Sequence, residues 1–112
     1  MVEYSLNLDI IFSSLSDPTR RDILQRLALK ELTVGEVAKK YKNLTLAAIS
    51  KHLKVLEKAH LIVKRRDGKQ QYVQLAPAAL KGAEHYLQQY GLMVDKQLDS
   101  LEKYLKQEIR NA

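Results

Sequence analysis

The residues best suited to chemistry in this sequence are cationic side chains and hydrogen-bond donors gathered in one stretch. The segment 51–72 carries seven basic and two acidic residues, so it supplies a net charge of +5 out of a total of +6. A local excess of lysine and arginine is the electrostatic footprint of a protein that binds a polyanion such as DNA. A solvated, lysine-rich surface carries the same charge, so charge alone leaves both interpretations open.

No set of residues in the sequence is comparably suited to catalysis. The sequence of 112 residues contains no cysteine, which excludes a thiol nucleophile, a disulfide and a thiolate metal site. It also lacks a glycine-rich phosphate loop and a His-x-x-x-His metal pair. Asp17, Asp22 and Glu36 are interpreted as helix caps and surface charges rather than as a catalytic pair. We therefore do not expect an enzyme.

Length and hydropathy predict one modest domain outside the membrane. A chain of 112 residues is long enough for a single hydrophobic core. No apolar run approaches the roughly 20 residues of a membrane span. The segment 1–12 contains no basic residue and therefore lacks the start of a signal peptide. We expect a cytoplasmic protein with no membrane partner.

Apolar spacing predicts a first helix, and capping signals predict three more before residue 60. Asp17 followed by Pro18 suits an N-cap with proline in the first turn, and Thr33 with Glu36 matches a capping box. Thr45 is the expected cap of the fourth helix. A helix, a short turn at 42–44 and a second helix give the outline of a helix-turn-helix. The predicted helices span residues 6–15, 18–29, 33–41 and 45–59.

The predicted helix 45–59 has two different faces. One face carries the apolar stripe expected of core residues, and the other carries a small residue followed by lysines. Such a helix suits the major groove, because small residues allow close approach to base edges and lysines meet phosphates. An ordinary surface helix has the same pattern. The stripe is Leu46, Ile49, Leu53 and Leu56, and the opposite face is Ala47, Lys51, Lys54 and Lys58.

A charged hairpin follows this helix. The runs Leu61–Arg66 and Gln70–Leu75 are typical of strands, and Asp67-Gly68 between them predicts a two-residue type I′ turn. A basic hairpin directly after a helix-turn-helix is a wing, which reaches the minor groove where arginine is favoured. The donors at its tip are Arg65, Arg66, Lys69, Gln70, Gln71 and Tyr72.

The last predicted helix, Pro77 to about Arg110, has an apolar stripe with nearly heptad spacing. A helix of this size spans roughly 50 Å, which is too long for one small domain to cover. The stripe therefore predicts a homodimer. The alternative is two shorter helices, broken at Gly91, that fold back on the same chain. The predicted dimer contacts on this helix are Leu87, Tyr90, Val94, Leu98, Leu101 and Leu105.

Together these elements predict a mainly α fold with a small two-stranded β-wing. We expect a single winged helix-turn-helix domain over residues 1–112. Residues 1–76 form its DNA-binding core, with the wing at 61–75, and residues 77–112 form a long C-terminal dimerisation helix.

Three blocks of the sequence match a known pattern. The first, at 8–24, contains Ser-Asp-Pro-Thr-Arg-Arg, the second, at 44–59, contains Ser-Lys-His-Leu, and the third is the wing at 66–72. In combination they resemble the ArsR-type family of winged helix-turn-helix regulators over nearly the whole chain. The resemblance implies a dimeric repressor that binds a palindromic operator in double-stranded DNA, with an interface built from the first and last helices. It adds Leu8, Ile11 and Phe12 to the dimer contacts.

The resemblance also implies base and phosphate contacts from the helix 44–59, at Thr45, Leu46, Ala47, Ser50, Lys51 and His52. Many family members have glutamine and serine where this sequence has Leu46 and Ala47. These departures weaken hydrogen-bonded base readout, although both residues suit contact with a thymine methyl group. We expect Ser50, Lys51, the wing and DNA shape to contribute more of the specificity.

The metal-sensing motif of the family is incomplete here. Its two cysteines correspond to Thr33 and Gly35, and no cluster of histidines and carboxylates replaces them. We expect no metal and no cofactor. The long last helix resembles that of metal-independent members, which implies an unidentified effector ligand or a regulatory protein as the inducing partner.

Two functions remain after this comparison. The leading hypothesis is a sequence-specific regulator, a repressor, that binds an inverted-repeat operator as a homodimer through the helix 44–59 and the wing 61–75. The other is a winged-helix module for protein–protein interaction without specific DNA binding.

Overall fold

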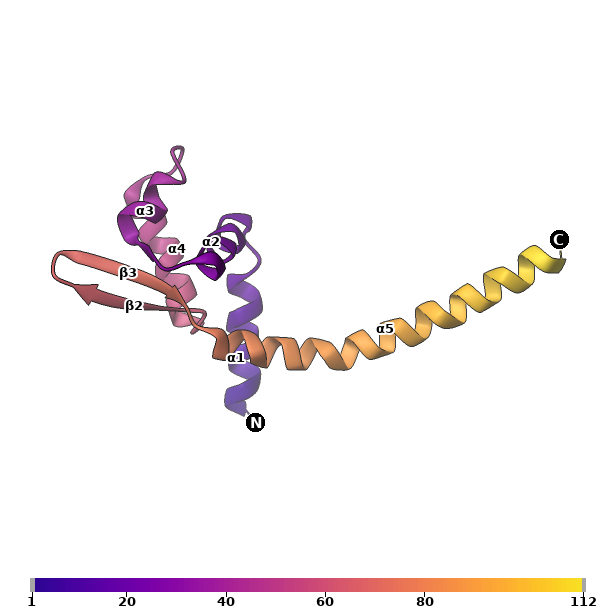
Figure 1. Ribbon diagram of the computed structural model, residues 1–112. Coiled ribbons are helices and arrows are strands. Elements are labelled where there is room, and N and C mark those ends of the chain that lie inside the picture. Colours follow the sequence, from indigo (N-terminus) through magenta and orange to yellow (C-terminus); the bar gives the residue numbers. More distant parts are fainter. Residues whose placement is uncertain (1, 112) are drawn as a thin grey trace. The chain divides into compact units, whose positions relative to one another are not determined.

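The computed structural model of the chain describes residues 2–111, and it describes the side chains of all of these except residues 2–7 and 92–95. The chain divides into two compact units, Met1–Lys81 and Gly82–Ala112. The elements follow one another as in Figure 1: α1 (Val2–Ser14), α2 (Pro18–Leu29), β1 (Leu32–Thr33), α3 (Val34–Lys39), α4 (Leu46–Lys58), β2 (Ile62–Asp67), β3 (Gln70–Leu75) and α5 (Pro77–Asn111). This confirms the predicted fold class.

The predicted capping residues start the helices of the first unit. The Asp17 carboxylate accepts a hydrogen bond of 3.0 Å from the backbone N–H of Arg20. Thr33 and Glu36 form the complete capping box, and the Thr45 hydroxyl accepts from the N–H of Ala48 at 3.0 Å. Each bond satisfies an N–H that the first turn of a helix leaves without a partner. The helix starts predicted from these residues are confirmed.

The sheet has one strand more than the sequence predicts. Its order is β1-β3-β2, and both pairings are antiparallel. β1 adds only Leu32 and Thr33, opposite Val73 and Tyr72. Two residues are too few to show the alternation that marks a strand in a sequence. The wing is therefore attached to the segment that leads into α3.

The predicted type I′ turn at Asp67-Gly68 is wrong. Asp67 pairs with Gln70, so the two turn residues are Gly68 and Lys69. Gly68 has a φ of 61°, and the backbone of Lys69 has no positive φ. A type I′ turn needs a positive φ at both residues, whereas type II′ places glycine first. The hairpin follows the second pattern.

The core of the first unit is built against α4. Ile49, Leu53 and Leu56 are fully buried, as the predicted stripe requires. Leu46 was placed on the same stripe, but it is 62% exposed. It lies in the first turn of α4, and the core stripe begins only at Ile49. The other large, fully buried apolar side chains are Ile23, Val37, Leu61, Ile62 and Val73.

A tight cap joins α4 to the wing. The N–H of Leu61 donates to the carbonyl of Leu56, and that of His60 donates to the carbonyl of Glu57, both at 3.0 Å. These two bonds form a Schellman motif. His60 takes the left-handed conformation, with a φ of 59°, at the position where glycine is most common. Leu56 and Leu61, the positions that commonly make an apolar contact in this motif, are both fully buried.

A polar cluster ties the end of α3 to α2. The Tyr41 hydroxyl donates to Asp22 at 2.5 Å, and Arg26 Nε donates to the same carboxylate oxygen at 3.0 Å. The Arg26 guanidinium also lies 5.7 Å from the centre of the Tyr41 ring. Burial, together with the bond to Asp22, raises the pKa of Tyr41 to about 12. The hydrogen bonds from Tyr41 and Arg26 lower the pKa of Asp22.

The second unit is helical throughout its described part. α5 continues through Gly91, so the alternative of two shorter helices broken there is wrong. Its described apolar side chains are largely exposed, among them Leu87, Leu98 and Leu101. The side chain of Val94, a predicted dimer contact, lies outside the described residues. None of the described helices combines the length and hydropathy needed to cross a membrane.

Replacing Tyr41 with phenylalanine should lower the free energy of unfolding by about 1 kcal/mol, because one partly buried hydrogen bond is lost. The raised pKa of Tyr41 means that its stabilising effect is present below pH 10 and is lost as the pH rises toward 12. Urea unfolding measures the first effect. In an alkaline absorbance titration, the variant should lack the tyrosine ionisation step that occurs at the highest pH in the wild type. Tyr104→Phe, at an exposed position, is the control. Equal stability of Tyr41→Phe and wild type at neutral pH would contradict this account.

Candidate nucleic-acid interface

The N-terminal half of α4 presents the predicted base-reading residues at the surface. Thr45, Leu46 and Ala47 are exposed in the cap and first turn, and Ser50 is half-buried one turn later. Thr45, Ala47 and Ser50 have small side chains, whereas Leu46 is a large apolar side chain that is 62% exposed. This arrangement permits the close approach that base readout requires.

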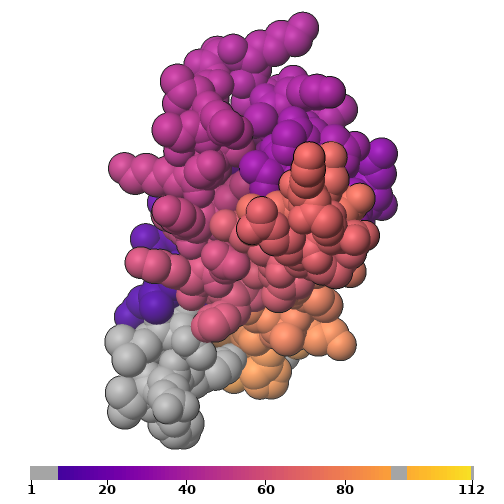
Figure 2. All heavy atoms as spheres, turned by 90° about the vertical axis from the view of Figure 1, so that its left-hand side faces the viewer, coloured from indigo at the N-terminus to yellow at the C-terminus, as the bar shows by residue number. Residues whose placement is uncertain are grey.

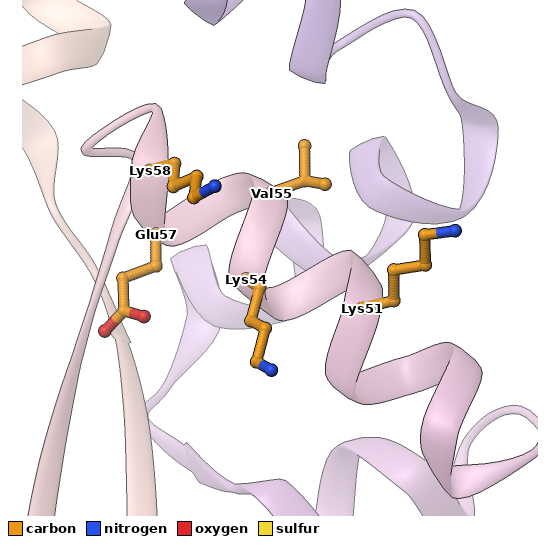
Figure 3. A pocket seen from close by; sticks show the side chains of 5 residues that line it. All are labelled: Lys51, Lys54, Val55, Glu57 and Lys58. Carbon is orange, nitrogen blue, oxygen red and sulfur yellow. The ribbon is translucent and has the colours of Figure 1, made fainter.

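Cations line the outer surface of α4. Lys51, Lys54 and Lys58, with Val55 and Glu57, surround an open hollow of about 480 Å³ (Figure 3). In this view Glu57 points toward the hairpin, whereas Lys51 points away from it. The Glu57 carboxylate lies 3.5 Å from Nζ of Lys64 on β2. Lys51 and Lys54 make no ion pair with a described side chain, so they are available to anions such as phosphates.

His52 is held by the chain itself. Its Nδ1 lies 3.3 Å from Nη1 of Arg20 and 3.9 Å from the Asp17 carboxylate. Arg20 Nε in turn donates to the carbonyl of Ser14 at 2.6 Å. In the neutral tautomer in which Nδ1 accepts from this guanidinium, which can only donate, the ring proton lies on Nε2. The sequence predicts His52 as a phosphate donor, and Nε2–H is the group that remains for it.

The register of the hairpin divides the predicted wing residues between two faces. Arg66 lies opposite Gln71, whereas Arg65 lies opposite Tyr72. Because side chains alternate along a strand, Arg66 shares the face of Lys64, which contacts α4. Arg65 lies on the other face. Arg66, Lys69, Gln70 and Gln71 are exposed, and neither Arg66 nor Lys69 makes an ion pair with a described carboxylate.

Arg65 is engaged within the chain. Its guanidinium donates to Glu31, lies 3.9 Å from the Asp67 carboxylate and stacks over Tyr72 with 4.5 Å to the ring centre. Tyr72 is half-buried. The sequence predicts both residues as DNA contacts, but it gives no signal for the partner Glu31. Arg20 and Asp17, the partners of His52, were likewise missed because both are far from His52 in the sequence.

The α4 and wing surfaces lie on one side of the first unit. Figure 2 looks onto the turn of the hairpin and shows the segments of α4 and the hairpin side by side, with long side chains projecting from both. The unpaired lysines of α4 and the exposed donors of the hairpin thus belong to neighbouring segments, whereas Arg65 lies on the other face of the hairpin. The positions of the metal-sensing cysteines, Thr33 and Gly35, lie at the start of α3. Among the described residues, no three histidines or carboxylates gather as metal ligands.

Comparison with known proteins agrees with this geometry. A helix-turn-helix domain family matches residues 15–65. The HTH-type transcriptional regulator YuzN of Bacillus subtilis is 45% identical over 69 residues, covering 56% of this chain and 75% of YuzN. The transcriptional repressor SdpR of the same species is 34% identical over 77 residues, covering 69% and 84%.

Solved structures extend the similarity over more of the chain. An ArsR family transcriptional regulator, RHA00566, superposes with a TM-score of 0.74 at 28% identity, covering 81% of this chain and 93% of that one. The chain belongs to the ArsR family of helix-turn-helix regulators. An ArsR-like regulator from Rhodococcus sp. RHA1 also matches, with a TM-score of 0.70 at 25% identity over 88% and 92% of the two chains.

As an ArsR-family member, the chain is a DNA-binding transcriptional regulator. Its helix-turn-helix is the pair α3 and α4, and its wing is the hairpin of β2 and β3. The relatives are regulators rather than enzymes. The interface described above is the natural candidate for contact with DNA.

Replacing Thr45 with alanine should lower the free energy of unfolding by about 1 kcal/mol, because the N-cap bond to Ala48 is lost. Thr45→Ser keeps the hydroxyl and should retain most of the stability. Thermal or urea unfolding of both variants provides the measurement. The cap assignment is wrong if alanine and serine have the same effect.

Proposed function

We propose that this regulator is a repressor that binds an inverted-repeat operator as a homodimer. The observation that carries the proposal is the combination of a buried stripe and a cationic outer surface on α4, directly beside a hairpin whose Arg66 and Lys69 are unpaired among the described residues. Repression is supported by the similarity to SdpR, which is named a transcriptional repressor.

In this proposal α4 enters the major groove with its N-terminal turn toward the bases. Leu46 and Ala47 contact thymine methyl groups, and Ser50 supplies a hydrogen bond. Lys51 and Lys54, which share the outer face of the helix, meet phosphates, and His52 donates from Nε2. Arg66, Lys69, Gln70 and Gln71 form the wing surface, which lies at the neighbouring minor groove, where basic side chains meet a stronger negative potential.

Dimerisation is supported by the exposed stripe of α5. Leu87, Tyr90, Leu98, Leu101 and Leu105 are each about half exposed. Large apolar side chains that recur in the exposed stripe of a helix mark an interaction site. The α1 contribution expected from the family resemblance is smaller than the sequence suggests. Leu8 and Ile11 are already buried within the chain and Phe12 is half-buried, whereas Ile10 is 44% exposed.

Selection of bound sequences from random duplex DNA should enrich an inverted repeat whose half-sites lie about 10 bp apart, one helical turn. The affinity should fall steeply with salt. Lys51→Ala and Lys54→Ala should each reduce the salt slope by about 1.8, because each removes one phosphate contact from each of the two subunits. Lys103→Ala, an exposed lysine on α5, is the matched control and should leave the slope unchanged. Failure to enrich any sequence would remove the basis for an operator-binding function and favour a protein-interaction module.

Replacing Leu101 with glutamate should shift the protein from dimer to monomer, because a charge would be buried in the α5 stripe. Analytical ultracentrifugation measures the shift, and operator affinity should fall at least about tenfold when one half-site is bound alone. Gln107→Glu adds the same charge on the opposite side of α5 and should remain dimeric. A dimeric Leu101→Glu protein would argue against this interface.

A further inference from the structure

One arginine crosses the outer face of the sheet. Thr33 on β1 pairs with Tyr72 on β3, and Tyr72 pairs with Arg65 on β2. Glu31 lies two residues before Thr33, so its side chain shares the same face. The Arg65 side chain runs from β2 over the Tyr72 ring and donates to Glu31 beside β1. It therefore links all three strands.

Its contacts leave Arg65 poorly placed to meet a phosphate. One edge of the guanidinium faces Glu31, another lies 3.9 Å from Asp67, and its plane covers Tyr72 at 4.5 Å from the ring centre. Glu31 is mostly covered, with 28% of its side chain exposed. The adjacent Arg66 points to the face shared with Lys64 and α4 and has no such partners among the described residues. The two neighbouring arginines thus have different environments.

We propose that Glu31, Arg65 and Tyr72 form a strap that positions the wing for DNA, and that Arg65 acts through this strap rather than by contacting DNA. The inference rests on the proposed function. Glu31 and Arg65 are positioning residues, and the phosphate contacts of the wing come from Arg66 and Lys69. β1 leads directly into α3, so the strap fastens the wing to the first helix of the helix-turn-helix.

The strap matters because few backbone pairs join β1 to the hairpin. Only two residue pairs join β1 to β3, whereas six join β2 to β3. Without the strap the hairpin stays formed, but its position against α3 and α4 is less restricted. Ordering the wing on DNA then costs conformational freedom, which weakens binding without removing any phosphate contact.

The variant Glu31→Gln distinguishes the two possible roles of Arg65, because the two roles predict opposite changes in DNA affinity. If Arg65 contacts phosphate, Glu31 competes with DNA, and Glu31→Gln should strengthen binding. If Arg65 belongs to the strap, Glu31→Gln should weaken binding. Arg65→Lys is the second probe, because lysine keeps a charge that suits a phosphate but loses the planar stacking on Tyr72 and the fork that meets a carboxylate.

The experiment measures the affinity of the full chain for the selected duplex, and for a scrambled duplex, at several salt concentrations. We expect Glu31→Gln and Arg65→Lys each to weaken binding by up to about fivefold, the range of surface ion pairs, and the double variant to be no weaker than the single variants. Their salt slopes should equal that of wild type, whereas Arg66→Gln should reduce the slope by about 1.8, one phosphate contact for each subunit of the dimer. Glu108→Gln, exposed on α5, controls for the general effect of removing a negative charge.

Two further readouts separate positioning from simple stability. Unfolding in urea gives the folded fraction of each variant, so that affinities refer to folded protein. The NMR signals of the Arg65 methylene protons, shifted by the Tyr72 ring, should move toward their unstacked values in Glu31→Gln. Tighter or unchanged DNA binding of Glu31→Gln, or a reduced salt slope in Arg65→Lys, would overturn the strap. The proposed function would still stand in that case, provided that the wild-type protein binds the selected duplex. If wild type binds neither duplex, the proposed function fails and the strap's role in DNA binding fails with it.

Discussion

The burial of one stripe of α4 is the interaction on which the rest of the structure depends. Ile49, Leu53 and Leu56 are fully buried, and removing each such side chain from water stabilises the fold by about 2 kcal/mol. These residues fix the rotation of the helix about its own axis. The same rotation turns Ala47, Lys51 and Lys54 outward. The buried core and the candidate DNA-binding surface therefore both follow from the way α4 packs.

Ion pairs within the chain determine which basic side chains remain available to bind an anion. The excess charge of residues 51–72 suggests a uniformly cationic surface, but the structure assigns some of it internal partners. Lys64 lies 3.5 Å from Glu57, and Arg65 is bonded to Glu31. Lys51, Lys54, Arg66 and Lys69 are left without an ion pair among the described side chains. The cations left for DNA are therefore a subset of the excess charge, and that subset is set by which basic residues find a carboxylate within the chain.

Local signals in the sequence predicted most of the elements. Asp17, Thr33 and Thr45 gave correct helix starts because each cap bond joins residues only three positions apart. The continuous α5 and the hairpin followed from periodicity and turn chemistry in the same way. The turn itself was displaced by one residue, since Asp-Gly and Gly-Lys both offer a glycine and only strand pairing decides between them.

Long-range contacts could not be read in this way. β1 exists because β3 pairs with it, and two residues carry no period of their own. The partners of the predicted site residues, Glu31 for Arg65 and Arg20 for His52, lie 34 and 32 positions away. The division of Arg65 and Arg66 between two faces depends on the register of the hairpin. The residue types of the site were thus predictable, whereas their pairing was not.

The cap between α4 and β2 has a consequence for the DNA partner. Only Ala59, His60 and Leu61 separate the helix from the strand, and two backbone hydrogen bonds with two buried leucines lock the connection. The base of the hairpin is therefore held close to the end of α4, and the Arg65 strap restricts the rest of the wing, so the two contacts have little freedom to adapt to a different groove spacing. Adaptation is left to the duplex, which must bend or narrow between the two contacts. Base steps that deform easily would then be favoured at positions that no side chain touches.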